Sequence, residues 1–274
     1  MDYDPIKNRL GDMVADRPWL TRCFYWLLQT LFLRAWYVRR ELKNQLRLIP
    51  PGNEISILDA GTGFGQFAYF LARRHSGVRI RAVDIKEDYL KRAARFISSV
   101  GLSPKVSFHL DDLTDLRACG PFNLILSVDV MEHIEEDLRV FENFHRVLAP
   151  GGIVVINTPS DQGGSDVHGT GEQGFIGEHV RDGYNREELI DKLRTAGLET
   201  KQAIYTYGTS GRLAWRLLIK YPMIMLGWNA LFVLFLPFYY LPVFPLGLLL
   251  NMLDLQTPNK TGTGLLVVAE KKAA

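Results

Sequence analysis

The sequence predicts an α/β protein with a doubly wound, mostly parallel, seven-stranded sheet and helices on both faces. Short apolar runs rich in β-branched residues alternate with helical patterns through the central part of the chain. Such runs are typical of strands buried on both faces, and strand–helix alternation favours parallel crossovers. A chain of 274 residues allows a sizeable core, and a formal net charge of +2 does not indicate a nucleic-acid partner.

Seven strands and four helices are expected in order along the chain. The first five strands are predicted at 55–60, 79–84, 105–110, 122–128 and 152–158, and the helices between them at 65–75, 86–99 and 133–148. A fourth helix is expected over 185–199, where Asn185 suits the N-cap and Gly197 the stop. The last two strands are predicted at 200–207 and 262–270, on either side of a long apolar segment.

A glycine-rich turn follows the first strand, in the stretch ILDAGTGFGQF. Asp59 ends the strand, and Gly61, Gly63 and Gly65 lead into the next helix. Glycine lets a ligand come close to the backbone, and the helix N-terminus behind it offers free N–H groups. Asp84 closes the second strand, where a carboxylate can accept hydrogen bonds from ribose hydroxyls. These residues predict a nucleotide-like cofactor at this edge of the sheet.

A third acid, Asp112, follows the third strand and completes a set at the carboxyl ends of consecutive strands, where open α/β sheets bind ligands. On these motifs, and on the stretches FNLILSVDVMEHIEED and FHRVLAPGGIVVINTPS, the chain resembles class I S-adenosylmethionine-dependent methyltransferases. The resemblance covers about residues 50–207 and the final strand, and it implies S-adenosylmethionine as the cofactor. The implied cofactor-binding residues are Asp59, Gly61, Gly63, Gly65, Asp84, Ile85, Asp112, Leu113 and Ser127.

Catalytic candidates follow the fourth strand, close to where the methyl group should lie. Methyl transfer needs positioning and, for a hydroxyl or amine acceptor, sometimes a general base. We predict His133 as the base, with Asp129 beside it. Two alternatives are a divalent metal at Asp129, Glu132 and His133, resembling quinone-pathway O-methyltransferases, and a turn that these residues only brace. No residue is assigned as a metal ligand.

A glycine-rich loop after the fifth strand is expected to form a lid over the acceptor, since long loops in compact domains are often functional. His179 is the third catalytic candidate. His179 and the nearby Arg181 are interpreted either as substrate-binding residues or as structural ones.

The segment from Tyr221 to Leu253 contains no charged side chain. In the fold that the chain resembles, the last strand is antiparallel, so both ends of this insert should emerge at the ligand-binding edge. Two membrane spans would need about 40 residues, at about 20 each, whereas this segment has 33. Its prolines are expected to break a continuous helix. We therefore predict a re-entrant or interfacial helical hairpin.

The flanking residues favour contact with a membrane. Arg212, Arg216 and Lys220 share one helix face ahead of the apolar run and suit anionic headgroups. Residues 18–38 are rich in Trp and Tyr, which favour the headgroup region. We expect 18–38 and 211–253 to bind a lipid bilayer surface, at the cytoplasmic face, in a monotopic or re-entrant manner.

The predicted organisation is an N-terminal aromatic helical segment (1–49), a methyltransferase domain (50–210 and 260–272) and a hairpin insert (211–259). The predicted function is methylation of an oxygen or nitrogen atom of a hydrophobic, lipidic acceptor, such as a lipid headgroup or a prenylated quinone precursor. One alternative is a soluble methyltransferase of a small molecule, with the apolar segments forming a cap or a dimer interface. Another is a non-catalytic membrane scaffold that binds S-adenosylmethionine.

Overall fold

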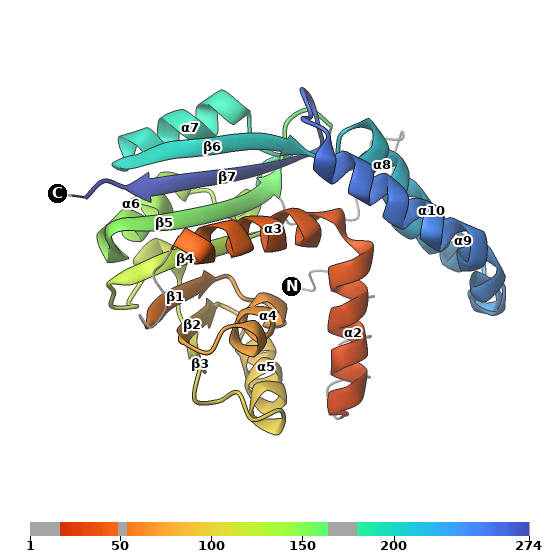
Figure 1. Cartoon of the computed structure of the whole chain (residues 1–274), viewed down its shortest axis with the longest axis horizontal. Coiled ribbons are helices and arrows are strands. Elements are labelled where there is room, and N and C mark those ends of the chain that lie inside the picture. Colours follow the sequence, from red (N-terminus) through yellow and green to blue (C-terminus); the bar gives the residue numbers. More distant parts are fainter. Residues whose placement is uncertain (1–16, 49–53, 164–179, 274) are drawn as a thin grey trace.

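A single seven-stranded sheet forms the centre of the computed structural model, which describes residues 17–48, 54–163 and 180–273 (Figure 1). The strand order is β3-β2-β1-β4-β5-β7-β6, and only β7 runs antiparallel to its neighbours. The predicted doubly wound, mostly parallel sheet is confirmed. The strands are β1 (Ile55–Ala60), β2 (Val78–Asp84), β3 (Val106–Leu110), β4 (Phe122–Val128), β5 (Leu148–Pro159), β6 (Leu198–Thr206) and β7 (Gly264–Lys271).

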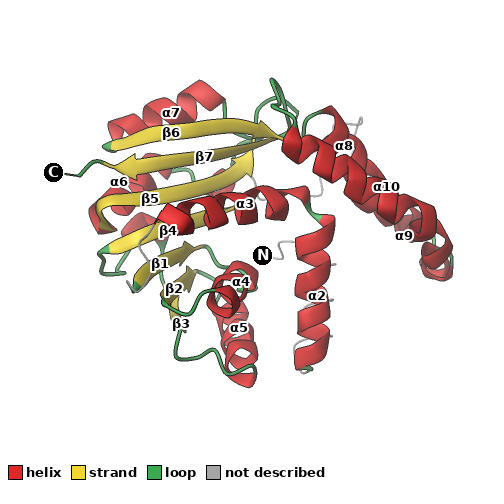
Figure 2. Ribbon diagram, in the orientation of Figure 1, coloured by secondary structure: helices red, strands yellow, loops and turns green. Residues whose placement is uncertain are grey.

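Helices cover both faces of this sheet, as Figure 2 shows. One apolar core lies between the sheet and α3 (Leu33–Leu48), α4 (Gln66–Arg74) and α5 (Glu87–Ser99). A second core lies on the opposite face, beneath α6 (Asp137–Val147) and α7 (Arg186–Thr195). The strands between them are buried on both sides, which is why their sequences are nearly continuous in apolar residues.

The fourth predicted helix begins and ends as its sequence indicates. The Asn185 side chain accepts hydrogen bonds from the backbone N–H groups of Glu187 and Glu188, which confirms it as the N-cap of α7. Gly197 follows the helix with a φ of +85°, a left-handed conformation that favours glycine.

The third predicted helix starts later than its pattern suggested. Residues Met131–His133 form a separate 3-10 turn, η2, and α6 begins only at Asp137. The buried Asp137 carboxylate accepts from the Tyr184 hydroxyl and pairs with Lys192 and Arg181. These partners come from far along the chain, so the local helical pattern at 133–136 could not reveal the break.

The N-terminal segment packs into the folded domain, and the binding of 18–38 to a membrane stays a prediction. It forms α2 (Pro18–Leu31) and α3, and its Tyr25 and Tyr37 side chains are buried rather than directed outward. Tyr25 packs against Tyr69 and Phe96 and donates a hydrogen bond to the carbonyl of Phe64. The Trp19 and Trp26 side chains of α2 are exposed.

A helical hairpin projects from the sheet between β6 and β7 (Figure 1). Its first arm comprises α8 (Thr209–Trp215), a π-helical turn η3 (Arg216–Lys220) and α9 (Tyr221–Trp228). A short 3-10 turn, η4 (Ala230–Leu234), forms the tip, and α10 (Leu236–Gln256) returns as the second arm. The predicted hairpin shape is therefore present.

The expectation that the prolines break a continuous helix is wrong for Pro242 and Pro245, which lie inside α10, whereas Pro222 and Pro237 stand in the first turns of α9 and α10. Hydrogen bonds join the two arms of the hairpin near these prolines. The hydroxyls of Tyr239 and Tyr240 donate to the carbonyls of Leu217 and Leu218 at 2.8 and 2.7 Å. These bonds also satisfy carbonyls of the π-helical turn, so they fasten the two arms where both helices are irregular.

Candidate functional site

The glycine turn after β1 is shaped by three left-handed residues, with φ of +77° at Gly61, +54° at Gly63 and +76° at Gly65. A Cβ at Gly61 would lie 2.3 Å from the side chain of Val130, so this glycine lets the turn pack against the segment after β4. A Cβ at Gly63 would meet nothing within 4 Å. Open space therefore lies beside the backbone of Gly63, as a ligand-binding turn requires.

Asp84, at the end of β2, is hydrogen-bonded to the same turn. Its carboxylate accepts from the backbone N–H of Gly63 at 2.8 Å and from that of Lys86 at 2.9 Å. Each oxygen keeps a further lone pair, and the side chain is half-buried. The neighbouring Ile85 is 65% exposed, so an apolar surface borders the carboxylate. This pairing suits a sugar and an attached flat ring.

Asp59 supports the turn from below. Its carboxylate is buried and accepts a hydrogen bond from the Thr62 hydroxyl at 2.6 Å. Burial raises the pKa of Asp59 to about 6. The structure thus makes Asp59 a brace of the loop, and its direct contact with a cofactor stays a prediction.

The other predicted cofactor residues differ in exposure. Asp112 is exposed, and its Oδ1 accepts from the backbone N–H and the hydroxyl of Thr114, which orients the carboxylate at the edge of the sheet. Leu113 is buried beneath it. Ser127 in β4 is fully buried, and its hydroxyl has no hydrogen-bond partner among the described residues. Asp112 therefore remains available to a ligand, whereas Leu113 lies behind the surface.

The segment after β4 brings together polar residues that sequence reasoning did not group. Asp129 has a φ of +53°, and its Oδ2 lies 2.5 Å from a guanidinium nitrogen of Arg34 in α3. The Asn157 side chain donates to Asp129 Oδ1 at 3.2 Å. Tyr207, just after β6, accepts from the backbone N–H of Arg34 at 3.0 Å. Both oxygens of Asp129 make a contact, so its carboxylate is held in place, and its part in catalysis stays a prediction.

The sequence analysis did not identify Arg34, Asn157 and Tyr207 as site residues, because the residues around them indicate other roles. Arg34 was included in an aromatic segment assigned to a membrane surface, although an isolated cation inside such a stretch is itself a signal of a specific partner. Asn157 is a polar residue at the end of a buried strand, which is a comparable signal.

Glu132 is buried, and its carboxyl accepts from the Thr158 hydroxyl at 3.1 Å. Burial, with a smaller effect of the Asp129 carboxylate, raises the pKa of Glu132 to about 8. These contacts favour the bracing interpretation of the turn for Glu132. Within the described ranges, no three His, Cys, Asp or Glu side chains gather in a group that could hold a metal ion.

Of the two predicted histidines, His133 ends η2 and is half-buried, and its role as the base stays a prediction. His179 lies outside the described residues. The nearby Arg181 is structural, since it pairs with Asp137 and donates to the carbonyl of Ile134 at 2.7 Å. The structure thus brings Asp129 and His133 to the end of β4, next to the glycine turn.

Comparison with known proteins assigns this region. Residues 57–152, which hold the glycine turn, Asp84 and the end of β4, match the family model described as a methyltransferase domain. This part of the chain is a methyltransferase domain. The domain takes S-adenosylmethionine as its cofactor.

Two curated relatives of the methyltransferase domain act on different atoms. Norajmaline N-methyltransferase of Rauvolfia serpentina is 29% identical over 102 residues, which are 37% of this chain and 35% of that protein. Ubiquinone biosynthesis O-methyltransferase of Caulobacter sp. (strain K31) is 30% identical over 110 residues, or 39% of this chain and 42% of that protein. The chain thus spans less than half the length of these relatives.

A solved structure extends the likeness to the whole methyltransferase fold. Phosphoethanolamine N-methyltransferase 2 of Haemonchus contortus, in complex with S-adenosyl-L-methionine, has a TM-score of 0.56 and 20% sequence identity. The match covers 86% of this chain and 53% of that one. At this identity the comparison shows the fold.

The site of the methyltransferase domain fits this cofactor. The open space at Gly63 admits the cofactor beside the backbone, and the carboxylate of Asp84 would hold the ribose hydroxyls. Asp112 and Ile85 border the expected adenine position. When bound, S-adenosylmethionine supplies an electrophilic methyl group, and the protein's part is to position the acceptor in line with it.

Replacing Asp84 by Ala in the methyltransferase domain is expected to weaken S-adenosylmethionine binding roughly tenfold to a hundredfold, because charge-assisted hydrogen bonds contribute about 1.5–3 kcal/mol. Isothermal titration calorimetry measures the change. Glu87→Gln, an exposed neighbour at the start of α5, is the matched control. Unchanged affinity in the Asp84 variant would place the ribose elsewhere.

The stability of the methyltransferase domain is expected to fall as the pH rises from 4.5, the ordinary pKa of glutamate, to about 8. The unfolded chain releases the Glu132 proton at the lower pH, whereas the native state retains it up to the higher one, so the unfolded state binds fewer protons across this window. Glu132→Gln should flatten the fall but not abolish it, since the raised pKa of Asp59 acts in the same direction.

Urea denaturation at several pH values within this window measures the slope, with Glu136→Gln on the exposed turn before α6 as the control. Equal slopes for the wild type and Glu132→Gln would show that Glu132 is ionised in the native state.

Proposed function

We propose that this protein is a membrane-associated, S-adenosylmethionine-dependent methyltransferase that methylates an oxygen or nitrogen atom of a lipidic acceptor. The observation that supports this most strongly is the place where the apolar hairpin joins the domain. β6 ends at Thr206, opposite Gly264 at the start of β7, and Gly264 is also opposite Pro159 at the end of β5. The hairpin therefore leaves and re-enters the sheet at the edge where the site lies.

The hairpin presents an unusual amount of exposed apolar surface. Leu241 is 79% exposed and Trp228 is 77% exposed. Further large apolar side chains that are at least half exposed are Leu231, Val233, Leu234, Phe235 and Phe238. Contiguous apolar surfaces of this kind are typical of membrane or protein contacts. The most exposed of these side chains gather at or near the tip, which favours insertion of the tip into a lipid layer.

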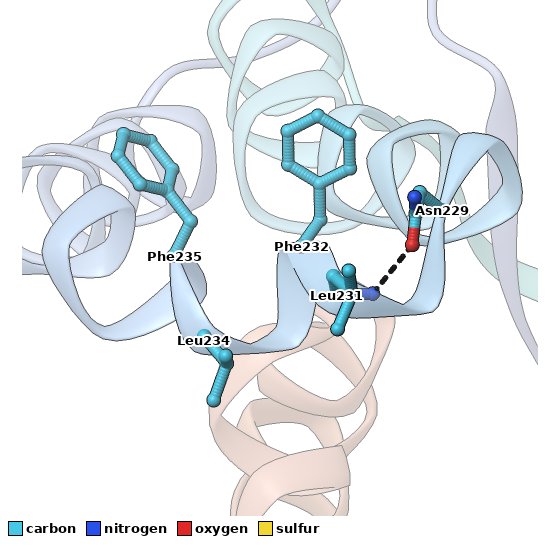
Figure 3. A pocket seen from close by; sticks show the side chains of 5 residues that line it. All are labelled: Asn229, Leu231, Phe232, Leu234 and Phe235. Atoms are coloured by element: carbon cyan, nitrogen blue, oxygen red, sulfur yellow. Dashed lines mark hydrogen bonds between the residues drawn. The ribbon is translucent and has the colours of Figure 1, made fainter.

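A shallow apolar groove lies at this tip, lined by Asn229, Leu231, Phe232, Leu234 and Phe235 (Figure 3). The rings of Phe232 and Phe235 point to one side of the η4 turn, and the two leucines point to the other. The Asn229 side chain accepts from the backbone N–H of Leu231 at 2.9 Å, so the turn satisfies a polar group internally. Apolar side chains on both sides of the turn suit an environment of lipid chains.

The charges along the first arm indicate a shallow depth of insertion. Lys220 is the last charged residue before the tip, and α9 adds eight residues beyond it, or about 12 Å at about 1.5 Å per residue. One leaflet contributes about 15 Å of hydrocarbon. Insertion to this depth leaves Lys220 at the level of the headgroups, with Arg216 and Arg212 farther from the hydrocarbon along the same arm.

Among the described helices, α10 is the one that is long and apolar enough to cross a membrane, with a mean hydropathy of 1.5 and 11% of its best window buried. A complete crossing by the hairpin would draw the three basic residues of the first arm into hydrocarbon, which is costly. The outer surface of α2 adds Trp19 and Trp26, which are 60% and 58% exposed. We therefore favour a monotopic arrangement on the cytoplasmic side, with α2 at the interface.

Label transfer tests the proposed function. The protein is incubated with methyl-labelled S-adenosylmethionine, vesicles made from a total lipid extract, and an aqueous metabolite pool, and each fraction is analysed for label. Label in a lipid or quinone fraction is the expected result. Label in the aqueous pool alone would favour a soluble enzyme with an apolar cap, and binding of the cofactor without any transfer would favour a scaffold.

A further inference from the structure

We propose that Arg34 binds the acceptor oxygen in its ionised form, so that the site selects an acceptor with an acidic hydroxyl, such as a phenol. This inference rests on the proposed function and narrows its acceptor. In this proposal the guanidinium of Arg34 stabilises the acceptor oxygen as an anion, so that no protein base is needed for methylation.

The position of Arg34 places it beside the cofactor turn. Its partner Asp129 directly precedes Val130, whose side chain abuts Gly61 of the glycine turn. The carboxyl end of β4 carries Asp129, and β4 lies next to β1 in the sheet. α3, which carries Arg34, packs on the face of the sheet that α4 and α5 also cover. A group bound to Arg34 therefore lies between the glycine turn and the end of β5.

The guanidinium of Arg34 is held in place, but several of its N–H donors have no partner among the described residues. It stacks over the Phe32 ring at 4.6 Å and pairs with Asp129 through one nitrogen. Within the described ranges these are its side-chain partners, and the side chain is 24% exposed. An arginine has five N–H donors, so several remain for an oxygen atom of a ligand. A preorganised donor of this kind is most effective toward a negatively charged oxygen.

The surrounding charges keep the guanidinium of Arg34 ionised. Burial opposes the charge of Arg34, but the nearby Asp129 carboxylate holds the pKa of Arg34 above its ordinary value. Glu132 is neutral near pH 7 because its pKa is about 8. The charges of Arg34 and Asp129 thus cancel, and the Tyr207 hydroxyl is a further titratable group of the cluster.

Two features distinguish this cluster from an ordinary structural ion pair. The Asn157 side chain is 4% exposed, and its Oδ1 has no hydrogen-bond partner among the described residues. An unpaired buried acceptor is costly and marks a place for an ordered water that donates to it. Asp129 also holds a left-handed φ of +53°, which is strained for a residue other than glycine. Both features lie next to Arg34.

The chemistry balances without a protein base. An acidic hydroxyl loses its proton to water on binding, and Arg34 stabilises the resulting oxygen anion. That oxygen then forms a bond to the methyl carbon while the carbon–sulfur bond of S-adenosylmethionine breaks. The sulfur keeps the electron pair and becomes a neutral thioether.

The test measures ionisation directly, without turnover. The probe is a nitrophenol with an alkyl tail, which absorbs visible light only when ionised, bound to the full-length protein together with S-adenosylhomocysteine. Wild-type protein is expected to lower the pKa of the bound phenol by about 1–3 units. Arg34→Gln should abolish the shift, and Arg34→Lys should keep part of it because the charge remains but the fork of donors is lost.

The Asp129→Asn variant tests whether Arg34 binds the phenol oxygen or only holds Asp129 in place. It removes the negative charge beside Arg34, so the bound phenol should ionise as easily as in wild type or more easily. If Arg34 serves only to hold Asp129, the two variants should instead behave alike, and the proposal fails. Arg139→Gln, an exposed position on α6, is the matched control and should leave the shift unchanged.

Label transfer to a phenol and to the matched alkyl alcohol completes the test. The wild type should prefer the phenol, and Arg34→Gln should lower kcat/KM for the phenol roughly tenfold to a hundredfold while barely affecting the alcohol. Equal losses for both acceptors would contradict the inference. A normal optical shift with no transfer to any lipidic acceptor would instead overturn the proposed function and leave the phenolate site in place.

Discussion

Replacing Leu231, Leu234 and Phe238 together by Glu is expected to release this protein from lipid vesicles. Each of these side chains is at least 70% exposed, and burial of one such side chain contributes about 1.5–3 kcal/mol. Losing three of them, and adding three charges, should lower the partition into vesicles at least about a hundredfold, since about 1.4 kcal/mol corresponds to a factor of ten. Sedimentation with vesicles that contain anionic lipid measures the change.

The matched control for this experiment is Leu48→Glu, which alters an equally exposed leucine at the end of α3, away from the hairpin. Because all of the altered tip side chains are exposed, the affinity for S-adenosylmethionine should stay unchanged in the triple variant. A triple variant that still sediments with vesicles would exclude the hairpin tip as the main anchor. A wild-type protein that never sediments would favour a soluble enzyme with an apolar cap.

Replacing Asp254 by Ala is expected to have the largest effect on stability, because its buried carboxylate joins the base of the hairpin to the domain. It accepts from the Tyr37 hydroxyl at 2.8 Å, the Gly211 backbone N–H at 2.9 Å, and the Asn259 amide at 3.1 Å. An unsatisfied buried donor costs about 1–3 kcal/mol, and this change leaves these three donors without their acceptor. The free energy of unfolding should fall by about 3 kcal/mol or more.

Chemical denaturation in mild detergent measures this loss. Tyr37→Phe removes one hydroxyl from the same network and should cost about 1 kcal/mol. Gln256→Ala, an exposed position on the same helix, is the control and should change little. Limited proteolysis should also cut Asp254→Ala faster between β6 and the hairpin. A stability equal to that of wild type would mean that the hairpin is held by apolar packing alone.

Asp254 illustrates what could not be predicted from the sequence. It is the only charged residue on α10, and by local pattern it simply ends the uncharged segment. Its partner Tyr37 lies 217 positions away. The same pattern of aromatic residues fits a membrane surface and a protein core equally well, so the burial of Tyr25 and Tyr37 depends on what α2 and α3 pack against.

The sequence by itself determined the cofactor end of this methyltransferase domain. The glycine turn follows β1, Asp84 ends β2 and Asp112 lies two residues after β3. Residues at or next to strand ends reach the same edge of a parallel sheet wherever the strands lie. The hairpin could be predicted for a similar reason, since a long uncharged run is a local property.

Only the tertiary structure decided the proposed acceptor end. Arg34, Asp129, Asn157 and Tyr207 come from four separate elements, and their contacts depend on how α3 lies across the sheet. No periodicity records that placement, because it results from the fit of many apolar side chains at once. Residues at the end of a strand can therefore be predicted from the sequence. Contacts between residues of different helices and strands depend on the tertiary structure.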